Sequence, residues 1–174
     1  AEIRGCSDTY ASKFGNLAGL EFVIGDDKTI EEIPKVSALP PFADQVISFF
    51  NDLSKVIMKN GRAYSDVMTF GFWCRKSALM AEKAKYTDIE RRLGRGVVFH
   101  STPSNVPVNC AFSFAAGLLA GNVNIVRLPA KDFPQVSIIT DSIKEVLNTT
   151  HPDMAPYICM VKYPPSLDIT NYFS

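Results

Sequence analysis

The chain has 174 residues, of which 47% are hydrophobic, and this is enough to build the core of one or two domains. Its 18 basic and 18 acidic side chains cancel, so it lacks the positive field that attracts nucleic acid or an acidic membrane. The longest apolar run, Cys110 to Ala120, is too short to span a bilayer. We therefore expect neither nucleic-acid binding nor a membrane span.

The four cysteines show no spacing typical of a metal site, and three of them lie in apolar runs, where a free thiol behaves as a small core residue. They are Cys6, Cys74, Cys110 and Cys159. No signal peptide is visible. We expect reduced cysteines, no bound metal and a cytoplasmic protein.

The first half of the chain is helical and irregular in pattern. Residues 1–20 lack a period and are expected to form an N-terminal arm, and residues 20–24 to form a short strand or hairpin entry. Pro41 is expected to open a helix. Apolar residues at helical spacing predict that this helix continues from Phe42 to a C-terminal cap at Gly61.

A second helix is predicted from Ser65 or Asp66 to about Ala84, followed by a short helical piece at 88–93. Its aromatic side chains are interpreted as core and not as a ligand box. The inward-facing residues are expected to be Val67, Phe70, Trp73, Cys74, Ala78 and Ala81.

From residue 94 strands and helices alternate, which implies βαβ crossovers and a parallel sheet. Strands are predicted at 97–100, 122–128 and 156–163. Helices are predicted at 107–120, nearly apolar all round and so buried, from 133 to about 147, and at 167–173. The helix that begins at 133 carries one apolar stripe, formed by Val136, Ile139, Ile143, Val146 and Leu147.

Three strands are few for a parallel sheet, which needs both of its faces covered. The chain also stops after a strand and half a helix. We expect it to be a fragment of a longer protein.

The turn after the first of these strands carries the most specific pattern. In chain order come Gly96-Val-Val, Thr102-Pro-Ser-Asn-Val-Pro107, Leu118-Leu-Ala-Gly-Asn122 and Ile125-Val-Arg-Leu-Pro129. Together they resemble the aldehyde dehydrogenase superfamily, with its Pro-Trp-Asn-x-Pro turn, its apolar helix ending in Ala-Gly-Asn and its Val-Val-Lys-Pro strand. The variant found here is most similar to the lux-type acyl-CoA reductases, which reduce fatty acyl thioesters to aldehydes.

The resemblance implies an α/β fold with a partial Rossmann-like parallel sheet in three αβα layers, preceded by N-terminal helices. Residues 1–93 would form the N-terminal arm and helical segment, and residues 94–174 the first half of an NAD(P)-binding domain. It also implies an NADPH-dependent enzyme that takes its acyl group from acyl-CoA or an acyl-carrier thioester. Family members often form oligomers, so a homo-oligomer stays open for the full-length enzyme.

Asn105 stands where the family places a side-chain amide that stabilises the developing oxyanion. The alternative is that Asn105 caps the helix that starts near Pro107. The family lays its nicotinamide dinucleotide along the turn before it, formed here by Ser101, Thr102, Pro103 and Ser104. Because Ser104 replaces the family's tryptophan, the wall of that turn is smaller and more polar.

Arg127 stands where the family usually has a lysine that touches the adenosine ribose, and Lys131 follows near the glutamate of NAD-preferring members. Two cations suit a ribose 2′-phosphate and favour NADPH over NADH, although NADH stays open. The alternative is an ordinary surface pair at a strand exit.

The catalytic cysteine that the resemblance implies is not recognisable in this chain. Cys110 is close to Asn105, but it falls inside the predicted helix and has no base to activate it. His100 and His151 are interpreted as structural. We expect the catalytic cysteine outside this chain and an inactive fragment. An oxidative aldehyde dehydrogenase stays open, as does a non-catalytic binding module if the native chain ends here.

Overall fold

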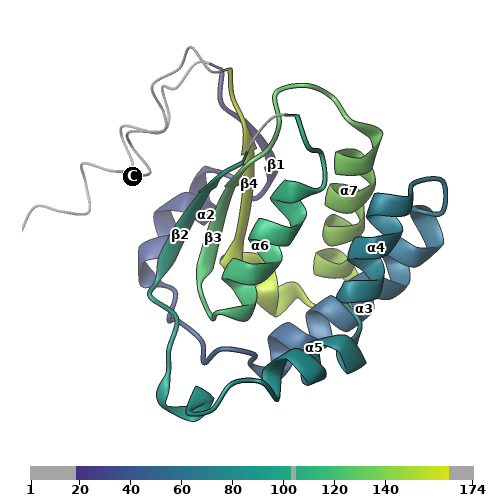
Figure 1. The fold of residues 1–174 in the computed structure, drawn as a ribbon. Helices are drawn as coiled ribbons and strands as arrows, with labels where there is room; N and C mark the ends of the chain where they lie inside the picture. The colour runs from purple at the N-terminus through teal and green to yellow at the C-terminus, as the bar shows by residue number, and fades with distance from the viewer. Residues whose placement is uncertain (1–18, 103–104, 165–174) are drawn as a thin grey trace, which may run out of the picture.

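The computed structural model describes residues 19–102 and 105–164, and its centre is one sheet with helices on both faces (Figure 1). The strands are β1 (Glu21–Ile24), β2 (Val97–Ser101), β3 (Val123–Arg127) and β4 (Ile158–Lys162), in the order β1-β4-β3-β2. Strands β2, β3 and β4 run parallel, as predicted, whereas β1 pairs with β4 antiparallel. The short strand expected at 20–24 therefore forms an antiparallel edge of the same sheet.

The helices divide unequally between the two faces of the sheet. Helix bounds are α2 (Asp27–Glu32), α3 (Asp44–Asn60), α4 (Ser65–Trp73), α5 (Lys76–Lys83), α6 (Asn109–Leu119) and α7 (Pro134–Thr149). Short 3₁₀ turns are η1 (Ile33–Lys35), η2 (Ile89–Arg91) and η3 (Pro152–Tyr157). Side chains of α2 and η1 pack on one face, and α6 and α7 cover the other, with α3 and α4 outside them. This confirms the α/β fold in αβα layers.

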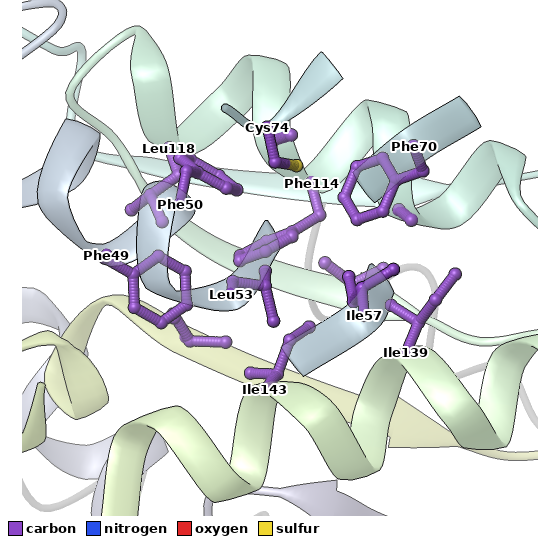
Figure 2. Packing of buried hydrophobic residues seen from close by; sticks show 14 of the residues in the cluster. Phe49, Phe50, Leu53, Ile57, Phe70, Cys74, Phe114, Leu118, Ile139 and Ile143 are labelled. Atoms are coloured by element: carbon purple, nitrogen blue, oxygen red, sulfur yellow. The ribbon is translucent and has the colours of Figure 1, made fainter. Parts of the chain in front are cut away.

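The main core lies between α3, α6 and α7, because each of these helices buries one apolar face there. Figure 2 shows Phe49, Phe50 and Leu53 of α3 packed toward Phe114 of α6 and Ile143 of α7. The predicted stripe of α7 is confirmed, since all five of its residues are buried. The helix predicted over 42–61 is confirmed with slightly narrower bounds, and Gly61 is its C-cap.

The single helix predicted from residue 65 to 84 is wrong. It divides into α4 and α5, because Arg75 takes an extended backbone conformation (ψ 142°). The N–H of Lys76 donates to Asn51 Oδ1 of α3 at 3.2 Å, which replaces a bond within a continuous helix. The break also changes the inward side, so that Leu79 is buried while Ala81 is exposed.

The prediction that Pro41 opens a helix is also wrong. Phe42 follows it with a positive φ of 53°, and α3 begins only at Asp44. Two contacts hold this unusual backbone: the Phe42 N–H donates to Leu119 O at 2.7 Å, and Lys83 Nζ donates to Phe42 O at 3.2 Å. Tertiary contacts with α6 and α5 therefore outweigh the preference of proline for a helix start.

Helix α6 is shorter than predicted, and it is buried on most sides but not all round. Pro107 and Val108 form a turn before it. Asn109, Ala116 and Ala120 are exposed, whereas most of the other residues in and around the helix are buried. The helical piece expected at 88–93 is the 3₁₀ turn η2.

Hydrophobic packing crosses the division expected at residue 93. One cluster joins α3 and α4 to α6, α7, β3 and β4, and β1 adds a strand to the sheet. The division into two domains stays a prediction. The helix expected at 167–173 and nearly all of the arm at 1–20 lie outside the described residues. In the described ranges, no helix is both long and apolar enough to cross a membrane.

Candidate functional site at the strand ends

The three parallel strands end at one edge of the sheet. Ser101 of β2 is in register with Arg127 of β3, which is in register with Val161 of β4. Because neighbouring strands lie about 4.8 Å apart, Ser101, Arg127 and Lys162 form a strand-end row of polar residues, in which the side chains of Ser101 and Arg127 lie on one face of the sheet and that of Lys162 on the other. Ligands of open α/β sheets bind at this edge, outside the carboxyl ends of the strands.

The turn after β2 contains an unsatisfied hydroxyl. Ser101 is exposed, and Thr102 is half-buried. The Thr102 hydroxyl oxygen is buried and has no hydrogen-bond partner among the residues that the structure describes. Leaving such a buried hydroxyl without a hydrogen bond costs about 1–3 kcal/mol. We therefore expect Thr102 to find a partner outside the described residues. Pro103 and Ser104, also predicted to hold the cofactor, lie outside the described residues.

Asn105 is exposed in the turn that leads to α6. The first residue of this helix is Asn109, its N-cap is Val108, and no side chain caps it by a hydrogen bond. The alternative role of Asn105 as a helix cap is therefore wrong. The exposed position leaves the Asn105 amide accessible to solvent.

The two predicted cofactor-binding cations rest on aromatic rings. The guanidinium of Arg127 lies 4.5 Å from the centre of the Tyr163 ring, and Lys131 Nζ lies 5.3 Å from the centre of the Phe133 ring. Arg127 is half-buried and Lys131 is exposed. Cation–π contact holds each positive charge at the strand edge without neutralising it.

A third cation at this edge was not predicted. Lys162, the last residue of β4, donates from Nζ to Asp132 Oδ1 over 2.7 Å. The ammonium holds the pKa of Asp132 below its usual range. A lysine at the end of an apolar strand is a signal in the sequence for a cation at this edge. Its partner Asp132 could not be predicted in the same way, because it lies in a loop 30 residues earlier.

A polar network lies under the turn, between the sheet and α6. His100 Nδ1 lies 2.8 Å from Ser113 Oγ, and His100 Nε2 lies 2.8 Å from Asn124 Oδ1. Because Asn124 Nδ2 donates to Asn122 O at 2.8 Å, its oxygen must face the histidine. His100 therefore carries its proton on Nε2 and accepts from Ser113. Burial lowers the pKa of His100, which favours this neutral form.

Helix α6 approaches this network closely because residue 117 is glycine. A Cβ at Gly117 would overlap Asn124 Oδ1 and would lie 2.7 Å from His100 Nε2. Through His100, Ser113 and Asn124 the network connects β2, α6 and β3. His100 thus holds these three elements together, which agrees with its interpretation as a structural residue.

His151 lies at the opposite, amino-terminal end of β4, just before η3. Its Nε2 is 3.0 Å from Asp52 Oδ2 of α3, and its ring packs edge-on against Phe49. The side chain of Lys55 and this histidine keep the pKa of Asp52 below its usual range. His151 thus connects α3 to the chain before β4, away from the strand-end row.

The cysteines in the described part of the chain are poor nucleophiles. Cys74, Cys110 and Cys159 are buried and free. Burial raises the pKa of Cys110 to about 11 and that of Cys159 to about 12. The Cys110 thiol also donates to Pro107 O at 3.1 Å. A thiolate, which is the reactive form, is therefore disfavoured at all three positions.

The one pocket described here lies away from the strand-end row. The described residues contain no group of three or more His, Cys, Asp or Glu side chains that could hold a metal ion. A pocket of about 290 Å³ lies at the far end of α6 from Asn105. It is lined by Pro41, Phe42, Trp73, Glu82, Tyr86, Ile89, Arg92, Ala116, Leu119 and Ala120.

Comparison with known proteins gives a family match. A family model described as acyl-CoA reductase (LuxC) matches residues 35–170, which includes α3 to β4 and the whole strand-end row. Searches of curated proteins and of solved structures gave no match. The match covers most of the chain and agrees with the motifs around Asn105 and Arg127. This chain belongs to the LuxC family of acyl-CoA reductases.

Proposed function

We propose that this chain supplies half of the cofactor site of an acyl-CoA reductase, which converts an acyl thioester to an aldehyde. The family match over residues 35–170 is the observation that carries this proposal. The polar row at the carboxyl ends of β2, β3 and β4 supports it, because this is where open α/β sheets bind their ligands.

The residues at the strand ends fit a nicotinamide dinucleotide. The hydroxyl of Thr102, which has no partner among the described residues, offers a donor and an acceptor, and the cations of Arg127 and Lys131 offer partners for phosphate. When bound, this cofactor supplies the hydride that reduces the acyl group. Ser101 and Thr102, with Pro103 and Ser104, would hold it along the turn. Arg127 and Lys131 would bind the 2′-phosphate that distinguishes NADPH from NADH.

Asn105 would stabilise the negative charge that forms on the acyl oxygen. An uncharged N–H donor aimed at this oxygen lowers the barrier because the charge develops only in the transition state. The exposed position of Asn105 and its absence from the cap of α6 leave the amide available for this role.

A cysteine thiolate is required to displace CoA and to hold the acyl group as a thioester. The three described thiols are buried and disfavour ionisation, and in the family that this chain resembles the catalytic cysteine lies farther along the sequence, so we place it outside this chain. The 174-residue chain alone would then be inactive. The acyl-carrier thioester as donor, a cytoplasmic location and a homo-oligomer remain predictions.

A direct test supplies acyl-CoA and NADPH to the enzyme that contains this chain and quantifies aldehyde and free CoA. Aldehyde and CoA should form in equal amounts with the NADPH consumed, and the 174-residue chain should form none. Oxidation of aldehydes without any reduction of acyl-CoA would favour the oxidative aldehyde dehydrogenase instead. Turnover by the 174-residue chain alone would refute the placement of the nucleophile.

A further inference from the structure

The pocket of about 290 Å³ lies between α4, α5 and the carboxyl end of α6. Its walls are mostly apolar, and three aromatic side chains from separate parts of the chain line it: Phe42, Trp73 and Tyr86. The centres of the Phe42 and Tyr86 rings lie 5.8 Å apart. Since α6 has 11 residues, which rise about 1.5 Å each, its length separates the pocket from the turn that contains Asn105 by about 16 Å.

The backbone around this pocket is held in unusual conformations. Among the described residues, Phe42 (φ 53°) and Asp88 (φ 61°) are the two non-glycine residues with a positive φ. Phe42 lines the pocket, and Asp88 directly precedes Ile89, which also lines it. Such conformations are costly for bulky side chains, and they cluster at sites that clamp a ligand. Hydrogen bonds to α6 and α5 fix Phe42, so the pocket is formed before any ligand enters.

Positive charge dominates the chain around the pocket. Residues 75–95 include α5 and η2 and contain seven basic and three acidic side chains, although the charges of the whole chain cancel. Arg92 lines the pocket, and no carboxylate in the described part of the chain forms an ion pair with it. Glu82 also lines the pocket, but it already accepts from Lys85 Nζ at 2.6 Å. The surroundings therefore favour an anionic group at Arg92.

The size of the pocket limits its ligand. Pockets for drug-sized molecules measure about 300–1,000 Å³, so this one suits a small molecule or one apolar chain and not a whole dinucleotide or CoA. We propose that the pocket binds an apolar carboxylate, whose hydrocarbon part packs on Phe42, Trp73 and Tyr86 and whose carboxylate pairs with Arg92. This inference goes beyond the proposed function and does not rest on it, because the pocket lies away from the strand-end row.

Trp73 reports on the site directly, because it is the single tryptophan of the chain. Hexanoate, heptanoate and octanoate are each titrated into the 174-residue chain below their critical micelle concentrations, and the fluorescence of Trp73 is followed. We expect a saturable change, with a dissociation constant that falls by about 4-fold for each added methylene group that the pocket buries. Octanol and octylamine have the same chain length without the negative charge and should bind about 3-fold more weakly than octanoate, or weaker still.

Two substitutions, each with a matched control, test the pocket itself. Ala116→Leu enlarges a side chain of the lining and should weaken octanoate by about 10-fold or more, because it excludes about two methylene groups of the ligand. Its control is Ala81→Leu on the exposed side of α5, outside the lining. Arg92→Met removes the charge and should weaken octanoate by about 3-fold, whereas Arg91→Met, the control, should not. Both arginines are exposed, so these two variants test the proposal even if Ala116→Leu fails to fold.

The proposal is supported by a preference for octanoate over octanol that disappears in Arg92→Met and persists in Arg91→Met. It is overturned if Trp73 shows no saturable response, if octanoate, octanol and octylamine bind equally, or if the variants and their controls lose the same affinity. Self-association of the chain that Ala116→Leu abolishes, without binding of octanoate, would also overturn it and would assign the pocket to a second copy of the chain.

Discussion

Asn105 is the residue whose chemistry is easiest to separate from its contribution to the fold. It is exposed and does not cap α6, so Asn105→Ala should leave the free energy of unfolding nearly unchanged. In the full enzyme we expect the substitution to lower kcat by about 10²-fold or more, because a donor to the oxyanion is lost. Steady-state kinetics with acyl-CoA, together with a titration of NADPH, would measure both quantities. An unchanged kcat would refute the role at the oxyanion.

His100 should make the stability of the protein depend on pH. Burial lowers its pKa below the ordinary 6.5, so the unfolded chain takes up this proton more readily than the folded chain does. The stabilisation is complete above pH 6.5 and is lost as the pH falls through the folded-state pKa.

His100→Gln removes this titration. Urea unfolding between pH 7.5 and 5 should therefore show a steeper loss of stability for the wild type than for the variant, within about the range where histidine titrates. Parallel curves for the two proteins would contradict the assignment of a neutral, buried His100.

Single residues differ in how far the sequence alone could place them. The family resemblance predicted Arg127 at the strand edge, because it stands in the Ile125-Val-Arg-Leu-Pro129 motif. The network of His100, Ser113 and Asn124 was not predicted, since its members lie 13 and 24 residues apart and are ordinary when considered singly. The best signal for it was Asn124, a polar residue in the middle of a buried strand.

At the scale of elements, local pattern predicted α7 and failed between α4 and α5. The stripe of α7 repeats every three or four residues, and every member packs into one core. The break at Arg75 depends instead on Asn51, which lies on another helix and accepts the N–H of Lys76. No feature within residues 65–84 reports that contact.

The packing of α6 on the sheet provides a test at this scale. Gly117→Ala should lower the free energy of unfolding by about 1–3 kcal/mol, because its methyl group would enter the space of Asn124 and His100. The control is Ala116→Gly on the exposed side of α6, which should cost only about 1 kcal/mol of helix propensity. Urea unfolding measures both, and a stabilised Gly117→Ala variant would contradict the close approach.

At the scale of the whole molecule, the two predicted parts share one hydrophobic cluster and one sheet. The core joins α3 to α6 and α7, and β1 pairs with β4 across the division at residue 93. The sequence changes its pattern there, but the pattern could not show which elements would share a core. Predicting the shared core would require knowing how α3 packs against α7.

Residues 94–174 produced alone should therefore lose cooperative unfolding, because they expose the apolar faces that α3 and α4 cover. Circular dichroism during a urea titration would detect this against the 174-residue chain. A sharp transition of equal midpoint in the shorter piece would show that residues 94–174 form an independent domain.

The central claim is that the strand-end row forms part of an NADPH site, and Arg127→Ala tests it most directly. Arg127 sits on β3 at the middle of that row, stacked on Tyr163. Titration of NADPH and NADH into the full enzyme should show that the substitution weakens NADPH by about 10-fold or more and NADH much less. Equal losses for the two cofactors, or no loss for NADPH, would contradict the claim.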